Sequence, residues 1–454
     1  MIGWAGTSIV WFLMACGGSR DAQTARRERR NPVLLLSVDG LRPDHILQAD
    51  KYGLAVPNFR RFLKEGSYAT GVRGVLPSVT FPSETTILTG VSPRKHGVLA
   101  NTTFDPLEKN REGWFWYAKD IQVPTLWDAA TKQGLVTGNL YWPVSVGANV
   151  TYNVVHYWRS ATPDDRKLTR ALSTPGLVEE MEKALGPYPY GDDWSLPADE
   201  QRARFARYLI EKKKPAFMTF YFASLDAEEH LSGPFRRETF NVLEHLDTLI
   251  GELRDAAERV SQGRGVISVV SDHGFANYDK EINIRALMHD AGFFELDEKQ
   301  TITSWRAVPW LAGGSAAIMI KDPQDEDTKQ RVRQLFARYM EEPSGWVQRI
   351  WSGQEAGRVG GFPDATWVIE LKADYKFGRR FQGPWLLPGK RGGTHGYFPD
   401  NPEMNSAFFL VGPGVPEARS VGIIDLRDIA PTLAGFLGVS LPQAEGRRVV
   451  AASR

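Results

Sequence analysis

Three short apolar runs in this sequence each lead to an aspartate, and this pattern constrains the fold more than any other feature. The runs cover residues 33–38, 217–222 and 266–271, and the aspartates that follow them are Asp39, Asp226 and Asp272. Unbroken runs of this length, rich in Val, Ile and Phe, are typical of strands buried on both faces of a mostly parallel sheet. Helical patterns precede the second and third runs. The sequence therefore predicts an α/β fold with a mostly parallel central sheet and helices on both faces.

The three aspartates are expected at one edge of that sheet, because ligands of open parallel sheets bind outside the carboxyl ends of the strands. A single aspartate after a strand is an ordinary turn residue. Three carboxylates in one place repel one another unless a cation or shared protons offset their charge. We interpret them as part of a metal cluster.

Histidines with suitable spacing support a metal site. Asp226 and His230 are four residues apart and would share one face of a helix. His273 directly follows Asp272, and His395 lies in the glycine-rich stretch RGGTHGY, where the backbone can approach a metal closely. Each of these pairs also occurs by chance, so the prediction of a metal site depends on their combination. We interpret the other histidines as ordinary surface or core residues, namely His45, His96, His156, His245 and His289.

Cysteine chemistry is excluded from the folded body, since Cys16 is the only cysteine and belongs to the leader. A metal must therefore be held by His, Asp or Glu, a donor set that suits zinc in a hydrolytic site. Thr80 precedes a helix-like segment in which Pro82 fits the first turn. A helix N-terminus favours an anion such as phosphate at this position. The alternative is a threonine that only caps the helix.

Several motifs, in this order, resemble the nucleotide pyrophosphatase/phosphodiesterase family of the alkaline phosphatase superfamily. They are SVDGLRPD, TFPS, TGVSPRKHGVLANTTFDP, TLWDAA, YWP, DAEEH, SDHG, THGY and DLRDIAPTLAGFLGV. The resemblance covers nearly the whole folded body. It implies an alkaline-phosphatase-like fold and zinc-dependent hydrolysis of phosphodiester or pyrophosphate bonds through a phosphothreonine at Thr80.

The resemblance also implies roles for individual residues. One zinc ion would be held by Asp226, His230 and His395, and a second by Asp39, Asp272, His273 and Thr80. Asn101 would contact a phosphate oxygen, and Phe81 and Tyr221 would flank a nucleoside base. Three positions depart from the family pattern: Val79 replaces Lys, Ser83 replaces Asn and Glu229 replaces Gly. None of them removes a ligand, but all bear on the substrate.

The main alternative is a phosphomonoesterase that uses the same threonine and two zinc ions. The stretch from Trp142 to Val146 holds no cation for the extra phosphate charge, which favours a singly charged small diester such as a nucleotide. A sulfatase would need a cysteine or serine nucleophile in a different motif. A metal-stabilised binding protein would need no nucleophile. The net charge of +1 gives no reason to expect a nucleic-acid partner.

The ends of the chain set the expected organisation. Residues 1–16 resemble an export or lipoprotein signal, in which Cys16 would carry a lipid anchor, and residues 17–31 form a basic linker. We predict one catalytic domain over 32–454, with a small lid-like elaboration at 301–383, located in a bacterial periplasm or cell envelope. Arginines follow the apolar run instead of preceding it, so a mis-assigned start codon or a disordered leader remains the alternative.

Overall fold

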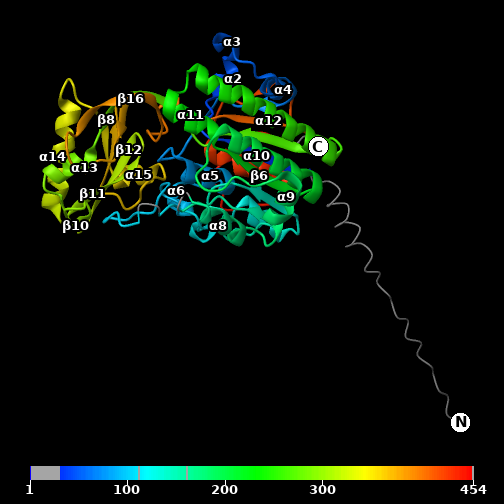
Figure 1. The fold of residues 1–454 in the computed structure, drawn as a ribbon, viewed down its shortest axis with the longest axis horizontal. Helices are drawn as coiled ribbons and strands as arrows, with labels where there is room; N and C mark the ends of the chain where they lie inside the picture. Colours follow the sequence, from blue (N-terminus) through cyan, green and yellow to red (C-terminus); the bar gives the residue numbers. More distant parts are fainter. Residues whose placement is uncertain (2–30, 111–112, 160–161, 452–454) are drawn as a thin grey trace.

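The computed structural model describes residue 1 and residues 31–110, 113–159 and 162–451. A larger α/β body and a smaller lobe pack side by side (Figure 1). The predicted signal, Cys16 and nearly all of the basic linker lie outside the described residues. Within the described residues, no helix is both long and apolar enough to cross a membrane.

The body is built on an eight-stranded sheet with the order β18-β2-β17-β7-β1-β6-β4-β5. Strand β17 is antiparallel to both of its neighbours, and the other neighbouring pairs are parallel. The strands are β1 (Val33–Val38), β2 (Ser67–Tyr68), β4 (Thr137–Leu140), β5 (Tyr152–Val154), β6 (Phe217–Phe222), β7 (Val266–Val270), β17 (Phe408–Val411) and β18 (Arg419–Ser420). The predicted mostly parallel sheet is confirmed.

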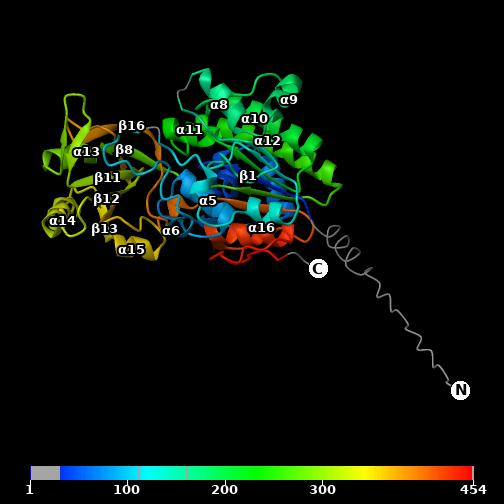
Figure 2. The same cartoon turned by 90° about the horizontal axis from the view of Figure 1, so that it is seen from below.

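The three predicted strands are adjacent, with β1 between β6 and β7. Ser37 pairs with Tyr221 on one side and with Val270 on the other, so the three strands end at the same edge. Every residue of β1, β6 and β7 is buried. Figure 2 shows why the apolar runs are unbroken: α10 and α12 cover one side of β1, and α5 and α16 cover the other.

The helices connect the strands in the expected alternating way. Those of the body are α2 (Pro43–Leu47), α3 (Ala49–Tyr52), α4 (Pro57–Glu65), α5 (Thr80–Thr89), α6 (Pro93–His96), α7 (Leu126–Lys132), α8 (Asp164–Leu172), α9 (Leu177–Leu185), α10 (Leu196–Tyr208), α11 (Ser224–Ser232), α12 (Arg237–Ser261) and α16 (Ile429–Leu437). The helical pattern before the second run corresponds to α10 and the short π-helix Leu209–Lys213 that continues it, and the pattern before the third run corresponds to α12.

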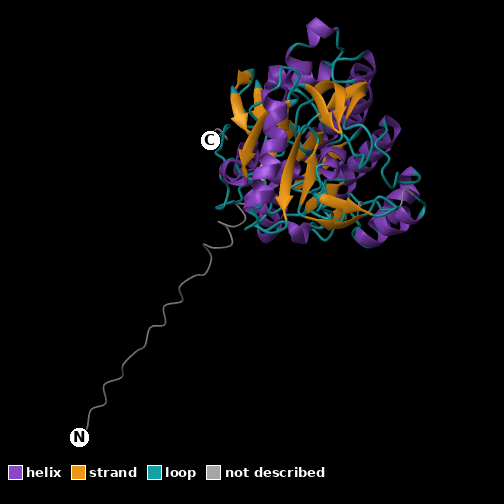
Figure 3. Ribbon diagram, turned by 90° about the vertical axis from the view of Figure 1, so that its left-hand side faces the viewer, coloured by secondary structure: helices purple, strands orange, loops and turns teal. Residues whose placement is uncertain are grey.

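The smaller lobe has its own sheets and its own apolar core. Its elements are β8 (Ala276–Ile282), α13 (Ile284–Asp290), β9 (Phe294–Leu296), β10 (Ile302–Trp305), β11 (Ala307–Ala312), β12 (Ser315–Ile320), α14 (Glu326–Glu341), β13 (Val347–Ser352), α15 (Gly353–Arg358), β14 (Trp367–Leu371), β15 (Asp374–Phe377) and β16 (Leu386–Thr394). Figure 3 distinguishes the strands of both parts from their helices. The lobe thus begins at β8, before the segment 301–383 that the sequence suggested, because β8 pairs with β15 and β16. A further short parallel pair joins β3 (Gly71–Arg73) to β19 (Ile423–Asp425).

Candidate active site

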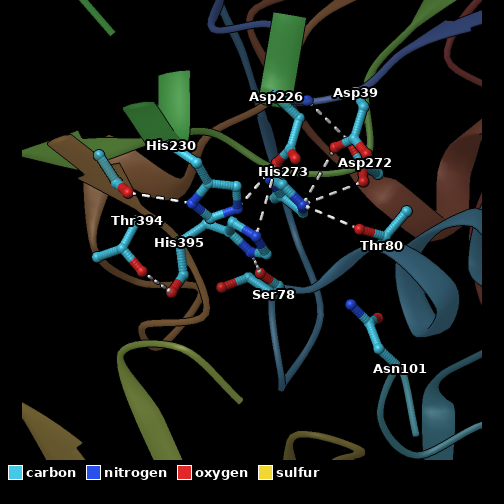
Figure 4. Close-up of polar contacts among 12 residues, drawn as sticks. Asp39, Ser78, Thr80, Asn101, Asp226, His230, Asp272, His273, Thr394 and His395 are labelled. Atoms are coloured by element: carbon cyan, nitrogen blue, oxygen red, sulfur yellow. Dashed lines mark hydrogen bonds and ion pairs between the residues drawn. The ribbon is translucent and has the colours of Figure 1, made fainter. Parts of the chain in front are cut away.

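The predicted ligands converge at the edge where β1, β6 and β7 end (Figure 4). Asp39 follows β1, Asp272 and His273 follow β7, and His395 follows β16 of the smaller lobe. Helix α11 begins just after β6 and presents Asp226 and His230 from one face, as the four-residue spacing predicted. Residues that are up to 356 positions apart in the chain thus share one site.

Two overlapping groups of side chains could each hold a metal ion. The ligand atoms of Asp226, His230 and His395 lie within 4.8 Å of one another, as do those of Asp39, Asp226 and His273. The Asp226 Oδ1 atom is 3.5 Å from His230 Nε2 and 3.7 Å from His395 Nε2. Asp226 therefore belongs to both groups.

Asp272 and Thr80 complete the second group. His273 Nε2 is 3.4 Å from Asp39 Oδ1 and 3.1 Å from Asp272 Oδ2. The Thr80 hydroxyl lies 3.5 Å from the same nitrogen. The structure thus places Asp39, Asp272, His273 and Thr80 around one point.

Each histidine is oriented by a backbone carbonyl. The Nδ1 atoms of His230, His273 and His395 lie 3.1, 3.2 and 3.1 Å from the carbonyl oxygens of Gly393, Gly274 and Ser78. A carbonyl only accepts, so each Nδ1 carries the proton and each Nε2 keeps its lone pair. All three Nε2 atoms lie toward the carboxylates (Figure 4). This tautomer is the one that a metal ion requires.

The carboxylates at the site lack partners that would neutralise them. Among the described residues, Asp39 Oδ1, Asp226 Oδ1 and Asp272 Oδ2 are buried and accept no hydrogen bond. Burial, with a further contribution from Asp272, raises the pKa of Asp226 to about 6. Burial lowers the pKa of His273 to about 3. Free oxygens beside neutral imidazoles form a donor set that fits a divalent cation such as zinc.

Glycines let the smaller lobe reach α11. A Cβ atom on Gly393 would lie 2.6 Å from the Glu229 carbonyl oxygen, and one on Gly392 would meet the carbonyl of His230. Strand β16 can therefore pass this close to α11 only without side chains at these two positions. This close approach brings His395 next to Asp226, as the glycine-rich stretch suggested.

Helix α5 begins at Thr80, with Val79 as its N-cap, so Thr80 is its first residue. The sequence predicted Thr80 just before the helix, which is wrong by one residue, and Pro82 in the first turn, which is confirmed. The Phe81 N–H donates to Asn101 Oδ1 at 2.9 Å, and the Ser83 N–H donates to the Val79 carbonyl at 3.2 Å. Pro82 has no N–H. Because Asn101 accepts with its oxygen here, its NH₂ group is the part of the side chain that can donate.

A sequence model of the family "Type I phosphodiesterase / nucleotide pyrophosphatase" matches residues 33–398. This chain belongs to that family. The match contains all seven residues of the candidate metal site. It also agrees with the resemblance seen in the sequence motifs.

Individual relatives show how far this similarity extends. Human ectonucleotide pyrophosphatase/phosphodiesterase family member 1 is 27% identical over 273 residues, which cover 58% of this chain and 26% of the relative. Venom phosphodiesterase CdcPDE from Crotalus durissus collilineatus is 23% identical over 428 residues, covering 90% and 45%. The chain thus spans between about a quarter and a half of these relatives. Murine ectonucleotide pyrophosphatase/phosphodiesterase 5 shares the fold, with a TM-score of 0.65 at 20% identity and coverage of 91% and 97%.

Phe81 and Tyr221 are both at the site, but neither offers an open ring face. They are 1% and 4% exposed. The Tyr221 hydroxyl donates to Asp39 Oδ2, on the side of the carboxylate opposite the free oxygen. Tyr221 therefore orients a candidate metal-holding residue, a contact that the pairing of β1 with β6 brings about and that the sequence did not suggest.

The contact between Tyr221 and Asp39 has a measurable consequence. We expect Tyr221→Phe to fold normally and to weaken zinc binding by about 10- to 100-fold, the usual effect of removing such a supporting hydrogen bond. Competition with a chromophoric zinc chelator would measure the change. Tyr68→Phe in β2, four strands from β6, is the matched control and should bind zinc as the native protein does. Unchanged zinc affinity in Tyr221→Phe would contradict this role.

A buried ion pair holds the start of α11 and was missed by the sequence interpretation. Asp199 Oδ2 accepts the N–H groups of Ala223 and Ser224 at 2.9 and 2.8 Å. Arg202 Nη1 lies 3.3 Å from Asp199 Oδ1, and both side chains are fully buried. A carboxylate at a helix N-terminus is favourable. No local signal distinguishes this pair from an ordinary exposed pair on a helix, because its importance comes from packing against α11.

Proposed function

We propose that this chain is a zinc-dependent hydrolase of phosphodiester or pyrophosphate bonds in nucleotides or related small diesters, with Thr80 as the nucleophile. The observation that carries the proposal is the Thr80 hydroxyl, 3.5 Å from His273 Nε2 at the border of the carboxylate and imidazole cluster. A structural zinc site needs no hydroxyl in that place. Membership of the type I phosphodiesterase / nucleotide pyrophosphatase family supports the same reaction.

Two zinc ions would be held by Asp226, His230 and His395, and by Asp39, Asp272, His273 and Thr80. When bound, they would supply Lewis-acid stabilisation of the phosphoryl oxygens and favour deprotonation of Thr80. The three carbonyl-bound histidines support this assignment, since they are fixed in the tautomer that a metal binds.

The chain's own residues would carry out a double displacement. Thr80 Oγ1 attacks phosphorus, the bond to one ester oxygen breaks, and that alcohol leaves with a proton. The phosphothreonine is then attacked at phosphorus by water, the Oγ1–P bond breaks, and Thr80 is regenerated. Asn101 NH₂ and the Thr80 N–H would donate to the phosphoryl oxygens, because the Phe81 and Ser83 N–H groups are already bonded.

The apolar side chains packed around Phe81 favour a diester over a monoester as the substrate. Val144, Val146 and Val155 pack there with tryptophan and tyrosine side chains. An apolar wall does not stabilise the second negative charge of a monoester. A phosphomonoesterase with the same threonine remains the second candidate.

The test compares bis-p-nitrophenyl phosphate with p-nitrophenyl phosphate on the zinc-loaded protein. We expect the diester to be hydrolysed at least about tenfold faster in kcat/KM, a difference of roughly 1.4 kcal/mol in transition-state binding. Dipicolinate should abolish turnover, and added zinc should restore it. Faster monoester turnover would replace this substrate class with the alternative, and turnover that persists without metal would contradict the zinc mechanism.

Two of the relatives are named an ectonucleotide pyrophosphatase/phosphodiesterase and a venom phosphodiesterase, and on that basis we extend an extracytoplasmic location to this chain. The lipid anchor at Cys16 and the periplasmic location stay predictions of the sequence, since the leader lies outside the described residues.

A further inference from the structure

The start of α11 is capped by a side chain from another helix. The N-cap residue of α11 is Ala223, which has no polar side chain with which to accept a hydrogen bond. Helix starts are usually capped by the side chain of the N-cap residue itself. Here the Ala223 and Ser224 N–H groups donate to Asp199 Oδ2, and Asp199 lies in the first turn of α10. The position of the first turn of α11 therefore depends on a residue of a different helix.

The carboxylate of Asp199 is itself held in place by Arg202. The Nη1 atom of Arg202 lies 3.3 Å from Asp199 Oδ1, and Nη2 donates to the Asp193 carbonyl at 2.6 Å. The guanidinium carbon lies 3.7 Å from the centre of the Tyr141 ring, and Tyr141 directly follows β4. A planar guanidinium that stacks on a ring and donates in two directions has one orientation. Arg202 thus fixes Asp199 relative to the central sheet.

This pair controls a distance between two candidate metal-holding residues. Asp226 and His230 are both on α11, so their separation is set within the helix. His395 follows β16 of the smaller lobe, and its Nε2 atom is 3.7 Å from Asp226 Oδ1. A shift of the first turn of α11 would therefore move Asp226 away from His395 without changing its spacing to His230. Asp226 is two residues after Ser224, next to the capped N–H groups.

Stability alone does not explain a buried ion pair at this place. Asp199 and Arg202 are both 0% exposed. Removing two charges from water is costly, and apolar residues of similar size often stabilise a protein equally well. Apolar residues could not accept the two N–H groups of α11. The arrangement is therefore explained by the geometry that it imposes on the first turn of this helix.

We infer that Asp199 and Arg202 are positioning residues for the candidate metal site, which hold Asp226 in place before a metal ion binds. This inference rests on the zinc-dependent reaction proposed above and identifies the part of the fold that presets its site. The ion concerned is the one assigned to Asp226, His230 and His395. Zinc tolerates deviations of only about 0.2 Å in its ligand distances, so a carboxylate already in place binds it with less ordering.

The first test measures zinc affinity in Asp199→Asn and Arg202→Lys by competition with a chromophoric chelator. The amide of Asp199→Asn has the size of the carboxylate, but its NH₂ group must face either Arg202 or the two N–H groups. Arg202→Lys keeps the charge and loses the planar fork. We expect each variant to bind the ion held through α11 at least about tenfold more weakly, the usual effect of losing an outer supporting contact. Native affinity in Asp199→Asn would overturn the inference.

Arg254→Met is the matched control for a general loss of stability. Arg254 is also a buried arginine, 3% exposed, and it pairs with Glu65 and Glu258 and lies over the Phe62 ring at 4.9 Å. These partners belong to α4 and α12. We expect this variant to unfold at a lower temperature, as Asp199→Asn does, and to keep zinc affinity within about twofold of native, since distant sites act independently. An equal loss of zinc affinity in Arg254→Met would overturn the specific role of Asp199.

Hydrogen exchange on the native chain tests the inference without any substitution. In the zinc-free protein, the Ala223 and Ser224 N–H groups should already exchange slowly, because Asp199 holds them. Mass spectrometry with fragmentation to single residues measures this rate. Fast exchange that slows only after zinc is added would overturn the inference, since the metal would then order the helix. A native protein that binds no zinc would count against the proposed zinc mechanism, whereas the exchange rates test the hold of Asp199 on α11 separately.

Discussion

Thr80→Ala is expected to lower kcat for bis-p-nitrophenyl phosphate by about 10⁴-fold or more, the scale seen when a catalytic nucleophile is removed. The hydroxyl is the only group of the Thr80 side chain that can form a covalent ester, and the substitution by alanine removes it. Its loss should not unfold α5, because Thr80 is not the N-cap and its side chain makes no capping hydrogen bond. The measurement is steady-state turnover with added zinc.

The control for this variant is Thr80→Ser, which keeps a hydroxyl in the same place. We expect it to retain turnover within about tenfold of the native protein, as a serine can also attack phosphorus. Zinc content should be close to native in both variants, since six other candidate ligands remain. Thr80→Ala activity within tenfold of native would show that the nucleophile is a water molecule or another residue.

Asp226→Ala is expected to have the second large effect, loss of both zinc ions and of turnover. Its carboxylate belongs to both groups that could hold a metal, and Oδ1 is 3.5 Å from His230 and 3.7 Å from His395. Removing it would leave the first group with two imidazoles and would take negative charge from the second. Zinc per chain, measured by atomic absorption after gel filtration, should fall from two to fewer than one.

His230→Ala is the matched comparison, because His230 belongs to the first group alone. Its side chain is 43% exposed, so the substitution leaves no buried cavity. We expect about one zinc ion to remain in this variant, held by Asp39, Asp272 and His273. Two zinc ions retained by Asp226→Ala would contradict the shared position of this carboxylate.

Much of the site could be predicted because its signals are local. Asp39 and Asp272 follow apolar strands, and the spacing of Asp226 and His230 fits one helix face. The glycines before His395 gave the correct reason for its close approach. Pro82 lies in the first turn of α5, as predicted, but Thr80 is already the first residue of the helix and does not precede it. Helix ends are weakly encoded, and boundaries commonly shift by one or two residues.

The contacts that were missed all join distant parts of the chain. Tyr221 reaches Asp39 across two paired strands, and Asp199 holds the first turn of α11. The ring of His156, which has no motif around it in the sequence, lies 5.7 Å from that of Phe81 and 5.6 Å from that of Tyr221. None of these contacts has a local pattern of residues, because each depends on strand register and on the packing of helices over the sheet.

By itself, the sequence determined the strand and helix types, the carboxylates at the strand ends and the absence of cysteine chemistry from the folded body. Those properties follow from side-chain periodicity and residue type, which act over a few neighbouring positions. Only the tertiary structure decided that Asp226 belongs to both groups that could hold a metal ion, that Tyr221 donates to Asp39 and that the smaller lobe starts at β8. The physical reason is that hydrogen bonds, ion pairs and ring contacts act at a few ångströms, and only the folded chain brings distant residues that close.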